Sequence, residues 1–181
     1  MKHSFTRRIF AETLGSFLLA ATVIGSGILA SRLSDGNDAI ALLGNTAATG
    51  AILFVLVSAL GPISGAHFNP AVTLVMALKR ELLAGEAVIY AVSQVAGCVL
   101  GAWLTHYMFE LPIFQASTTV REGLPQIVSE GAATFALVFA ILFVSRWRSV
   151  AAPSGARCAS LVSWTPNRWS SISASGQPGG V

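Results

Sequence analysis

Long apolar segments separated by short polar ones organise the 181-residue chain. Four of these segments, residues 9–30, 39–60, 87–109 and 127–144, are long enough to cross a bilayer as helices. A fifth, residues 69–79, would extend only about 15 Å as a helix, which is about half of a hydrocarbon core. The pattern predicts an all-α protein in a lipid bilayer, with four membrane-spanning helices and one re-entrant half-helix.

The short segment has the signals of a helix that begins inside the membrane. Asn69 is a favoured N-cap residue, and Pro70 suits the first helical turn. Lys79 and Arg80 end the apolar run. Irregular backbone at membrane depth is tolerated where it lines a cavity, and half-helices of this kind bind or pass solutes. We therefore expect the loop before Asn69 to line a path for a solute.

The charge pattern supports the membrane interpretation and predicts an orientation. Charged residues make up 10% of the chain, whereas soluble domains contain about 25%. The cations gather between spans rather than in a patch, so we expect no nucleic-acid partner. Seven cations fall on one predicted side and two, Arg32 and Arg121, on the other. The seven are Lys2, Arg7, Arg8, Lys79, Arg80, Arg146 and Arg148. The positive-inside rule then places the N-terminus in the cytoplasm.

An internal repeat links the first and fourth spans. Residues 11–19 (AETLGSFLL) and 129–137 (SEGAATFAL) share a glutamate, small residues, a hydroxyl residue, a phenylalanine and a leucine. The two glutamates, Glu12 and Glu130, are separated by three spans, so the copies face opposite ways. This arrangement predicts an inverted repeat, in which two halves meet at a midplane site.

The composition changes near Pro153, where the chain becomes rich in Ser, Gly, Pro and Arg. We predict a membrane region at 1–148, with a first repeat at 9–109 and the start of a second at 127–148. Residues 149–181 are predicted to be a non-homologous tail, either disordered or out of frame.

The segment 64–73 (SGAHFNPAVT), between the second and third spans, resembles the hallmark of the major intrinsic protein family. Residues 11–15 (AETLG), residues 94–97 (QVAG) and Gly101 support the resemblance, which covers about 5–148. It implies an aquaporin-like fold and a passive channel for water or small uncharged solutes, with no catalytic residue, metal or cofactor. It also implies a bacterial inner membrane and, for the full-length parent protein, a homotetramer.

The resemblance assigns roles to loop residues. Backbone carbonyls would form a ladder of acceptors, and the amide of Asn69 would donate to a solute at mid-membrane. The positive end of the half-helix would repel protons and cations. The implied pore-lining set is Gly65, Ala66, His67, Asn69, Pro70 and Ala71. Glu12 would anchor this loop, and by the repeat Glu130 would anchor a second one.

Thr49 matches the family's filter position in the second span, twenty residues before Asn69. Members selective for water or glycerol usually carry a bulky aromatic residue there. A small threonine therefore implies a wider filter, of the kind seen in members that admit small polyols or metalloid hydroxides such as arsenite.

Plainer interpretations stand beside these. His67 can be a satisfied loop histidine, Glu12 an interfacial carboxylate and Thr49 a small packing residue. Gly97 and Gly101 form a G-x-x-x-G pattern that usually indicates close helix packing. Because a second half-helix is missing from the sequence, we expect the chain as written not to conduct. The alternative function is a non-conducting assembly partner or a relic fragment of a channel.

Overall fold

The computed structural model describes residues 3–114 and 123–151, with side chains described up to residue 143. Five helices make up this part of the chain: α1 (Phe5–Leu33), α2 (Asp38–Ser64), α3 (Pro70–Leu78), α4 (Ala84–Met108) and α5 (Leu124–Ala151). Four are long and apolar enough to cross a membrane, α5 through its segment Leu124–Phe143. The prediction of an all-α membrane protein is thereby confirmed. The predicted tail lies outside the described residues from 152 onward, and α5 continues to Ala151, past the predicted boundary at 148.

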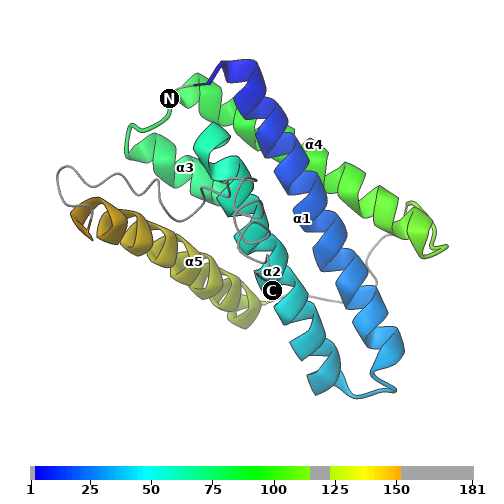
Figure 1. Cartoon of the computed structure of the whole chain (residues 1–181). Coiled ribbons are helices and arrows are strands. Elements are labelled where there is room, and N and C mark those ends of the chain that lie inside the picture. The colour runs from blue at the N-terminus through cyan, green and yellow to red at the C-terminus, as the bar shows by residue number, and fades with distance from the viewer. Residues whose placement is uncertain (1–2, 115–122, 152–181) are drawn as a thin grey trace, which may run out of the picture. The chain divides into compact units, whose positions relative to one another are not determined.

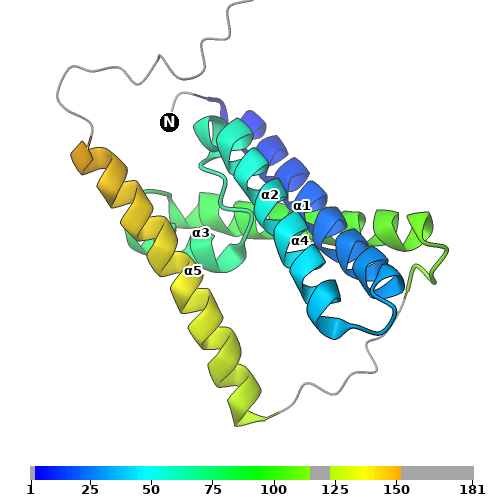
Figure 2. The same ribbon diagram turned by 60° about the horizontal axis from the view of Figure 1, so that its bottom comes forward.

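Helix α1 lies between α2 and α4 and packs against both, while the short helix α3 packs against α4 (Figure 1). The turned view in Figure 2 shows α3 as a short helix beside α4 and apart from α1. The third predicted span, residues 87–109, starts three residues later than α4, whose N-cap is Leu83. The half-helix begins and ends as predicted, since Asn69 is the N-cap of α3 and Lys79 its C-cap.

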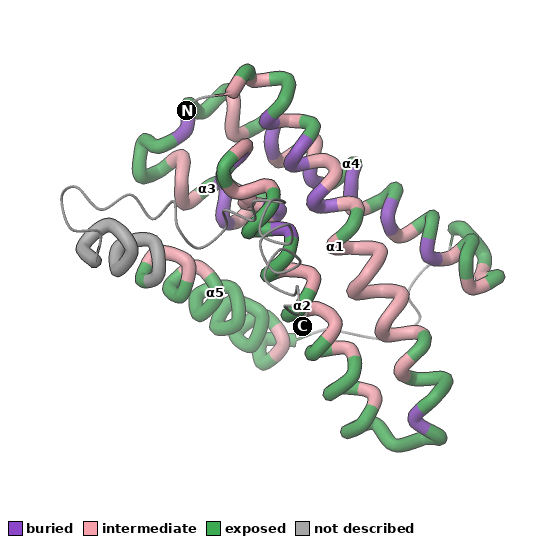
Figure 3. Tube along the Cα trace, in the orientation of Figure 1, coloured by how far each residue is buried: buried purple, intermediate pink, exposed green. Residues whose placement is uncertain are grey.

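Polar side chains dominate the buried interior of the described region. Eight polar or charged residues are buried, against six hydrophobic ones. Figure 3 shows the buried positions concentrated along α1 and α4 and near the start of α3. Many large apolar side chains are exposed instead, among them Phe54, Leu43 and Val92. This inversion suits a protein surrounded by lipid, because lipid solvates apolar surface and polar groups must pair with one another inside.

Two glycines bring α1 and α4 into backbone contact. A Cβ atom added at Gly97 would collide with the carbonyl oxygen of Thr13, and one added at Gly101 would collide with that of Phe17. Small residues at such a crossing allow close approach, which replaces the hydrophobic driving force that lipid removes. The packing interpretation of this G-x-x-x-G pattern is the one the structure shows.

Candidate pore loop

The loop that joins α2 to α3 has an unusual backbone. Gly65 ends α2 in the left-handed region at φ 98°, and Ala66 and Phe68 follow at φ 52° and 47°. Glycine adopts such angles freely, whereas another residue type loses about 1–2 kcal/mol there. A loop with two such residues requires restraint from outside itself.

Glu12 of α1 supplies much of that restraint. Its side chain is fully buried, and one oxygen, Oε1, accepts hydrogen bonds from the Ser64 hydroxyl at 2.6 Å and the His67 amide at 3.1 Å. The other oxygen, Oε2, accepts from the Phe68 amide and from the Gln94 side chain, both at 2.8 Å. Four donors thus converge on one carboxylate, and the two backbone donors belong to the strained part of the loop.

A second chain of hydrogen bonds connects α4 to the loop. Gln94 Nε2 also donates to Thr73 Oγ1 at 2.9 Å, and Thr73 Oγ1 donates to the Asn69 carbonyl at 3.1 Å. His67 Nδ1 lies 3.2 Å from the same hydroxyl. The imidazole ring of His67 is therefore held through Thr73 on α3, and Gln94 ties this chain to the carboxylate of Glu12.

Phe68 fixes the loop by packing. Its side chain is 4% exposed, and its ring lies directly against Gly15 of α1, where an added Cβ would overlap the ring atoms. Gly15, which follows Glu12 by about one helical turn, thus leaves room for the aromatic ring of Phe68. Hydrogen bonds to the Phe68 amide and packing of its ring act on the same residue.

Asn69 and the start of α3 present polar groups from the loop. Asn69 Oδ1 accepts from the Ala71 amide at 2.8 Å, so the N-cap bond fixes the side-chain amide. Within the described residues, neither Asn69 Nδ2 nor the carbonyls of Gly65, Ala66 and His67 take part in a hydrogen bond. Pro70 occupies the first position of α3, where the helix dipole places partial positive charge. The loop therefore keeps a side-chain donor and three carbonyl acceptors that have no partner within the described residues.

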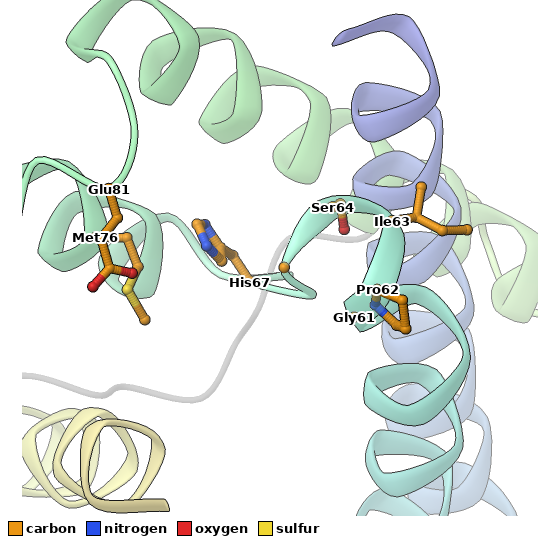
Figure 4. A pocket seen from close by; sticks show the side chains of 8 residues that line it. Gly61, Pro62, Ile63, Ser64, His67, Met76 and Glu81 are labelled. Atoms are coloured by element: carbon orange, nitrogen blue, oxygen red, sulfur yellow. The ribbon is translucent and has the colours of Figure 1, made fainter. Parts of the chain in front are cut away.

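A cavity of about 460 Å³ opens beside the loop (Figure 4). Its walls come from the last turn of α2, the loop, the last turn of α3 and the segment that follows α3. They are formed by Gly61, Pro62, Ile63, Ser64, Gly65, His67, Met76 and Glu81. Figure 4 shows the His67 ring between the loop and the Met76 and Glu81 side chains. Glu81 also forms an ion pair with Lys79 at 2.6 Å.

Two predicted site residues are not part of this cluster. Thr49 lies half-buried in α2, fifteen residues before the helix ends at Ser64, or about 22 Å along the helix axis. Glu130 is exposed on α5. The structure brings together Glu12 and the loop residues, whereas the roles of Thr49 and Glu130 stay predictions.

The sequence interpretation missed two members of the cluster. The charge pattern counts Arg8 only as an orientation signal, but it is 5% exposed and lies one helical turn before Glu12. Tyr90 is fully buried one turn before Gln94. The sequence does contain a pattern that points to them: Arg8 precedes Glu12, and Tyr90 precedes Gln94, by four residues, so each pair lies on one face of its helix. Only packing, however, shows that these two faces meet.

These features define a class: a membrane protein with a strained, internally anchored loop and a half-helix of the aquaporin type. The family model of the major intrinsic proteins matches residues 1–162. The chain belongs to the major intrinsic protein family, whose members are membrane channels.

Among its relatives is a protein named Aquaglyceroporin AqpS, from Rhizobium meliloti (strain 1021). The two are 53% identical over 148 residues, which cover 82% of this chain and 63% of the relative. Aquaporin NIP1-2 of Arabidopsis thaliana is 33% identical over 147 residues, covering 76% of this chain and 49% of the relative. A probable aquaporin PIP2-8 of Oryza sativa subsp. japonica is 36% identical over 107 residues, covering 59% and 38%. The chain thus spans between about two fifths and two thirds of the length of these relatives.

Proposed function

We propose that these residues form one half of a passive channel for water or small uncharged solutes. The observation that carries this proposal is the pore loop, in which Glu12 restrains a strained backbone beside a cavity of about 460 Å³. The carbonyls of Gly65, Ala66 and His67 accept hydrogen bonds from a solute, and Asn69 Nδ2 donates one. A solute loses its hydration and gains these partners in exchange, which lowers the barrier to entry.

The same groups disfavour ions. The dipole of α3 places partial positive charge at Pro70 and Ala71, where a cation or a proton would otherwise pass. Anions meet a ladder of carbonyl oxygens and the carboxylate of Glu81. The polar side chains of the cluster bond to one another and to backbone, an arrangement that suits a passive channel and neither an enzyme nor an ion-coupled carrier.

The solute class is proposed to include glycerol-like polyols and metalloid hydroxides such as arsenite. Thr49 supports this because a small filter residue leaves space that an aromatic residue would fill. A relative that bears the name aquaglyceroporin and shares 53% identity points the same way. Replacing Thr49 with Phe in a conducting form should reduce glycerol flux more than water flux, and equal reduction of both would argue against a filter role.

The proposed setting is a bacterial inner membrane, with the N-terminus in the cytoplasm and the working unit a homotetramer. The positive-inside distribution of cations supports the orientation. Labelling a cysteine introduced at Ser4, in a variant whose Cys98 and Cys158 are replaced by serine, with a membrane-impermeant reagent tests it, because a cytoplasmic residue reacts only after the cells are opened.

The test of conduction uses proteoliposomes and two proteins. One is the 181-residue chain, and the other joins residues 1–148 to the segment that follows the matching region in the Rhizobium meliloti relative. We expect the joined protein to raise water and glycerol flux above that of empty liposomes, independently of membrane potential. Exchange of Asn69 for Leu should remove most of that gain. A folded joined protein with the flux of empty liposomes would overturn the proposal.

A second candidate function is that of a non-conducting assembly partner or relic fragment of a channel. The observation that favours it is the outer side of α3, where Leu74 and Leu78 are 60% and 74% exposed within the described region. Such an apolar surface, which lipid also solvates, offers a second chain a face to pack against within the membrane. Co-purification of the tagged 181-residue chain with a complete family member would support this function, and its absence from such assemblies would count against it.

A further inference from the structure

Tyr90 of α4 joins three segments at one hydroxyl group. The residue is fully buried, and its hydroxyl accepts a hydrogen bond from Arg8 Nε of α1 at 2.8 Å. The same hydroxyl donates to the carbonyl of Ser64, the last residue of α2, at 3.2 Å. The Tyr90 hydroxyl therefore links Arg8 of α1 to the carbonyl of Ser64, where the pore loop begins.

The ring of Tyr90 is fixed as well. It stacks with Phe5 at a centroid distance of 6.3 Å and meets the His67 ring edge-on at 5.6 Å. The Arg8 guanidinium lies 5.2 Å from the centroid of the Tyr90 ring, within cation–π range, and pairs with Glu86 at 3.4 Å. Tyr90 thus contacts the side chain of one loop residue and the backbone of the residue at the loop's start.

We propose that Tyr90 is a positioning residue for the pore loop, and that Arg8, paired with Glu86, holds it in place. Tyr90 fixes the carbonyl of Ser64 and the ring of His67 at the wall of the cavity. The inference rests on the proposed function in taking His67 as pore-lining. Arg8 then acts inside the fold, in addition to any part it has in orienting the chain.

The geometry around Ser64 distinguishes this role from simple packing. The Ser64 hydroxyl donates to Glu12 and accepts from the Ala66 amide at 3.1 Å, while its carbonyl accepts from Tyr90. The hydroxyl and the carbonyl of Ser64 are therefore bound by residues of two different helices, α1 and α4. Ala66 and Phe68, which follow, have left-handed backbone angles. Release of the Ser64 carbonyl should loosen the loop first, because the stored backbone strain lies there.

Tyr90→Phe keeps the ring and removes the hydroxyl, so it isolates the hydrogen bonds. Thr105→Val is the matched control, since Thr105 is a buried hydroxyl residue of α4 that bonds to the Ala21 carbonyl of α1 at 3.2 Å, far from the loop. Amide hydrogen exchange is measured on the 181-residue chain in lipid nanodiscs. For Tyr90→Phe we expect exchange at Ala66, His67 and Phe68 to accelerate roughly two- to tenfold, as the loss of about one hydrogen bond implies.

The control should leave exchange in the loop unchanged. Unchanged loop exchange in Tyr90→Phe would overturn the proposal, and so would equal acceleration of the loop by Thr105→Val, since that indicates general loosening. If Tyr90→Phe does not fold, Glu86→Gln is used instead. It weakens the ion pair that holds Arg8 against Tyr90, at a partly exposed side chain. It should accelerate loop exchange in the same direction by a smaller factor, and no acceleration would overturn the proposal.

A second readout separates positioning from stability. In the joined channel protein described above, a structural defect lowers water and glycerol flux in proportion, because it removes folded copies. Displacement of the loop wall should instead change the ratio of the two permeabilities, and an unchanged ratio would overturn the proposal. A joined protein without any flux would sink the proposed function, whereas the exchange experiment would still decide the role of Tyr90.

Discussion

The contact between α1 and α4 has two halves that are built differently. In the half beside the loop, buried polar side chains meet: Glu12 bonds to Gln94, and Arg8 bonds to Tyr90. In the other half, glycines let the backbones touch, and the hydroxyl of Thr105 bonds to a backbone carbonyl of α1. The two helices therefore meet through hydrogen bonds between side chains at one end, and through close backbone approach with a side chain-to-backbone hydrogen bond at the other.

The difference follows from what each half must hold. Gly97 and Gly101 hold only a neighbouring helix, for which dispersion contacts suffice in lipid. The polar half must also hold a strained loop, in which the amide groups of His67 and Phe68 donate to the carboxylate of Glu12 and not to a helix carbonyl. Substitutions in the two halves should therefore fail in different ways.

The largest expected effect is at the carboxylate. All four partners of Glu12 are donors, so Glu12→Gln turns an amide N–H toward some of them. We expect the chain in detergent to lose about 2–4 kcal/mol of unfolding free energy, the value of one or two hydrogen bonds to a charged group. Glu110→Gln, at an exposed acid, is the control and should change little. Equal stability of the two variants would show that the carboxylate does not hold the loop.

The next effect tests the backbone half. Gly97→Ala places a methyl group on the Thr13 carbonyl and should destabilise the chain by about 1–3 kcal/mol. Gly85→Ala lies on the same helix with open space around it and should be neutral or stabilising by up to about 1 kcal/mol. Unfolding midpoints in a denaturing detergent titration compare the two. If the Gly97→Ala and Gly85→Ala variants have the same unfolding midpoint, the stability of the chain does not require close approach of α1 and α4.

A smaller effect is expected where the loop starts. Gly65→Ala imposes a side chain at φ 98° and should cost about 1–2 kcal/mol, in addition to crowding His67 Nε2. Gly61→Ala, one turn earlier in α2, meets only an ordinary contact with Ala66 and serves as the control. Loop amide exchange measured beside thermal unfolding should show the change confined to residues 65–69. A change spread evenly over α1 and α4 would contradict this localisation.

The smallest effect is at the exposed end of α3. Lys79→Gln removes the ion pair with Glu81, and both side chains are largely exposed. We expect a loss below about 1 kcal/mol that fades as salt is added. A larger, salt-independent loss would mean that this pair belongs to the loop support after all.

Much of the fold followed from local patterns. Span lengths, the half-helix and its Asn69 cap are set by runs of apolar residues and by capping chemistry, which act over a few residues. The predicted third span begins three residues late because the first turn of α4 contains Gly85 and the charged Glu86, which interrupt the apolar pattern. Helix boundaries of this kind depend on tertiary packing.

The candidate site was recovered in part. Glu12 and the loop residues were found through a family motif, since their spacing alone shows no contact across 55 positions. Arg8 and Tyr90 were missed because a cation beside a span end usually orients the chain, and a tyrosine in a span usually packs. Their bond joins residues 82 positions apart, and only the crossing of α1 and α4 creates it.

By itself, the sequence determined that this protein lies in a membrane, that the residues described by the structure include four apolar spans and a half-helix, and where that half-helix begins. These properties depend on hydrophobicity and capping, which are encoded locally. The tertiary structure alone decided which polar groups meet: four donors on Glu12, and Arg8 on Tyr90. In lipid, buried polar groups must find partners within the protein, and only the packed helices determine which partners lie within reach.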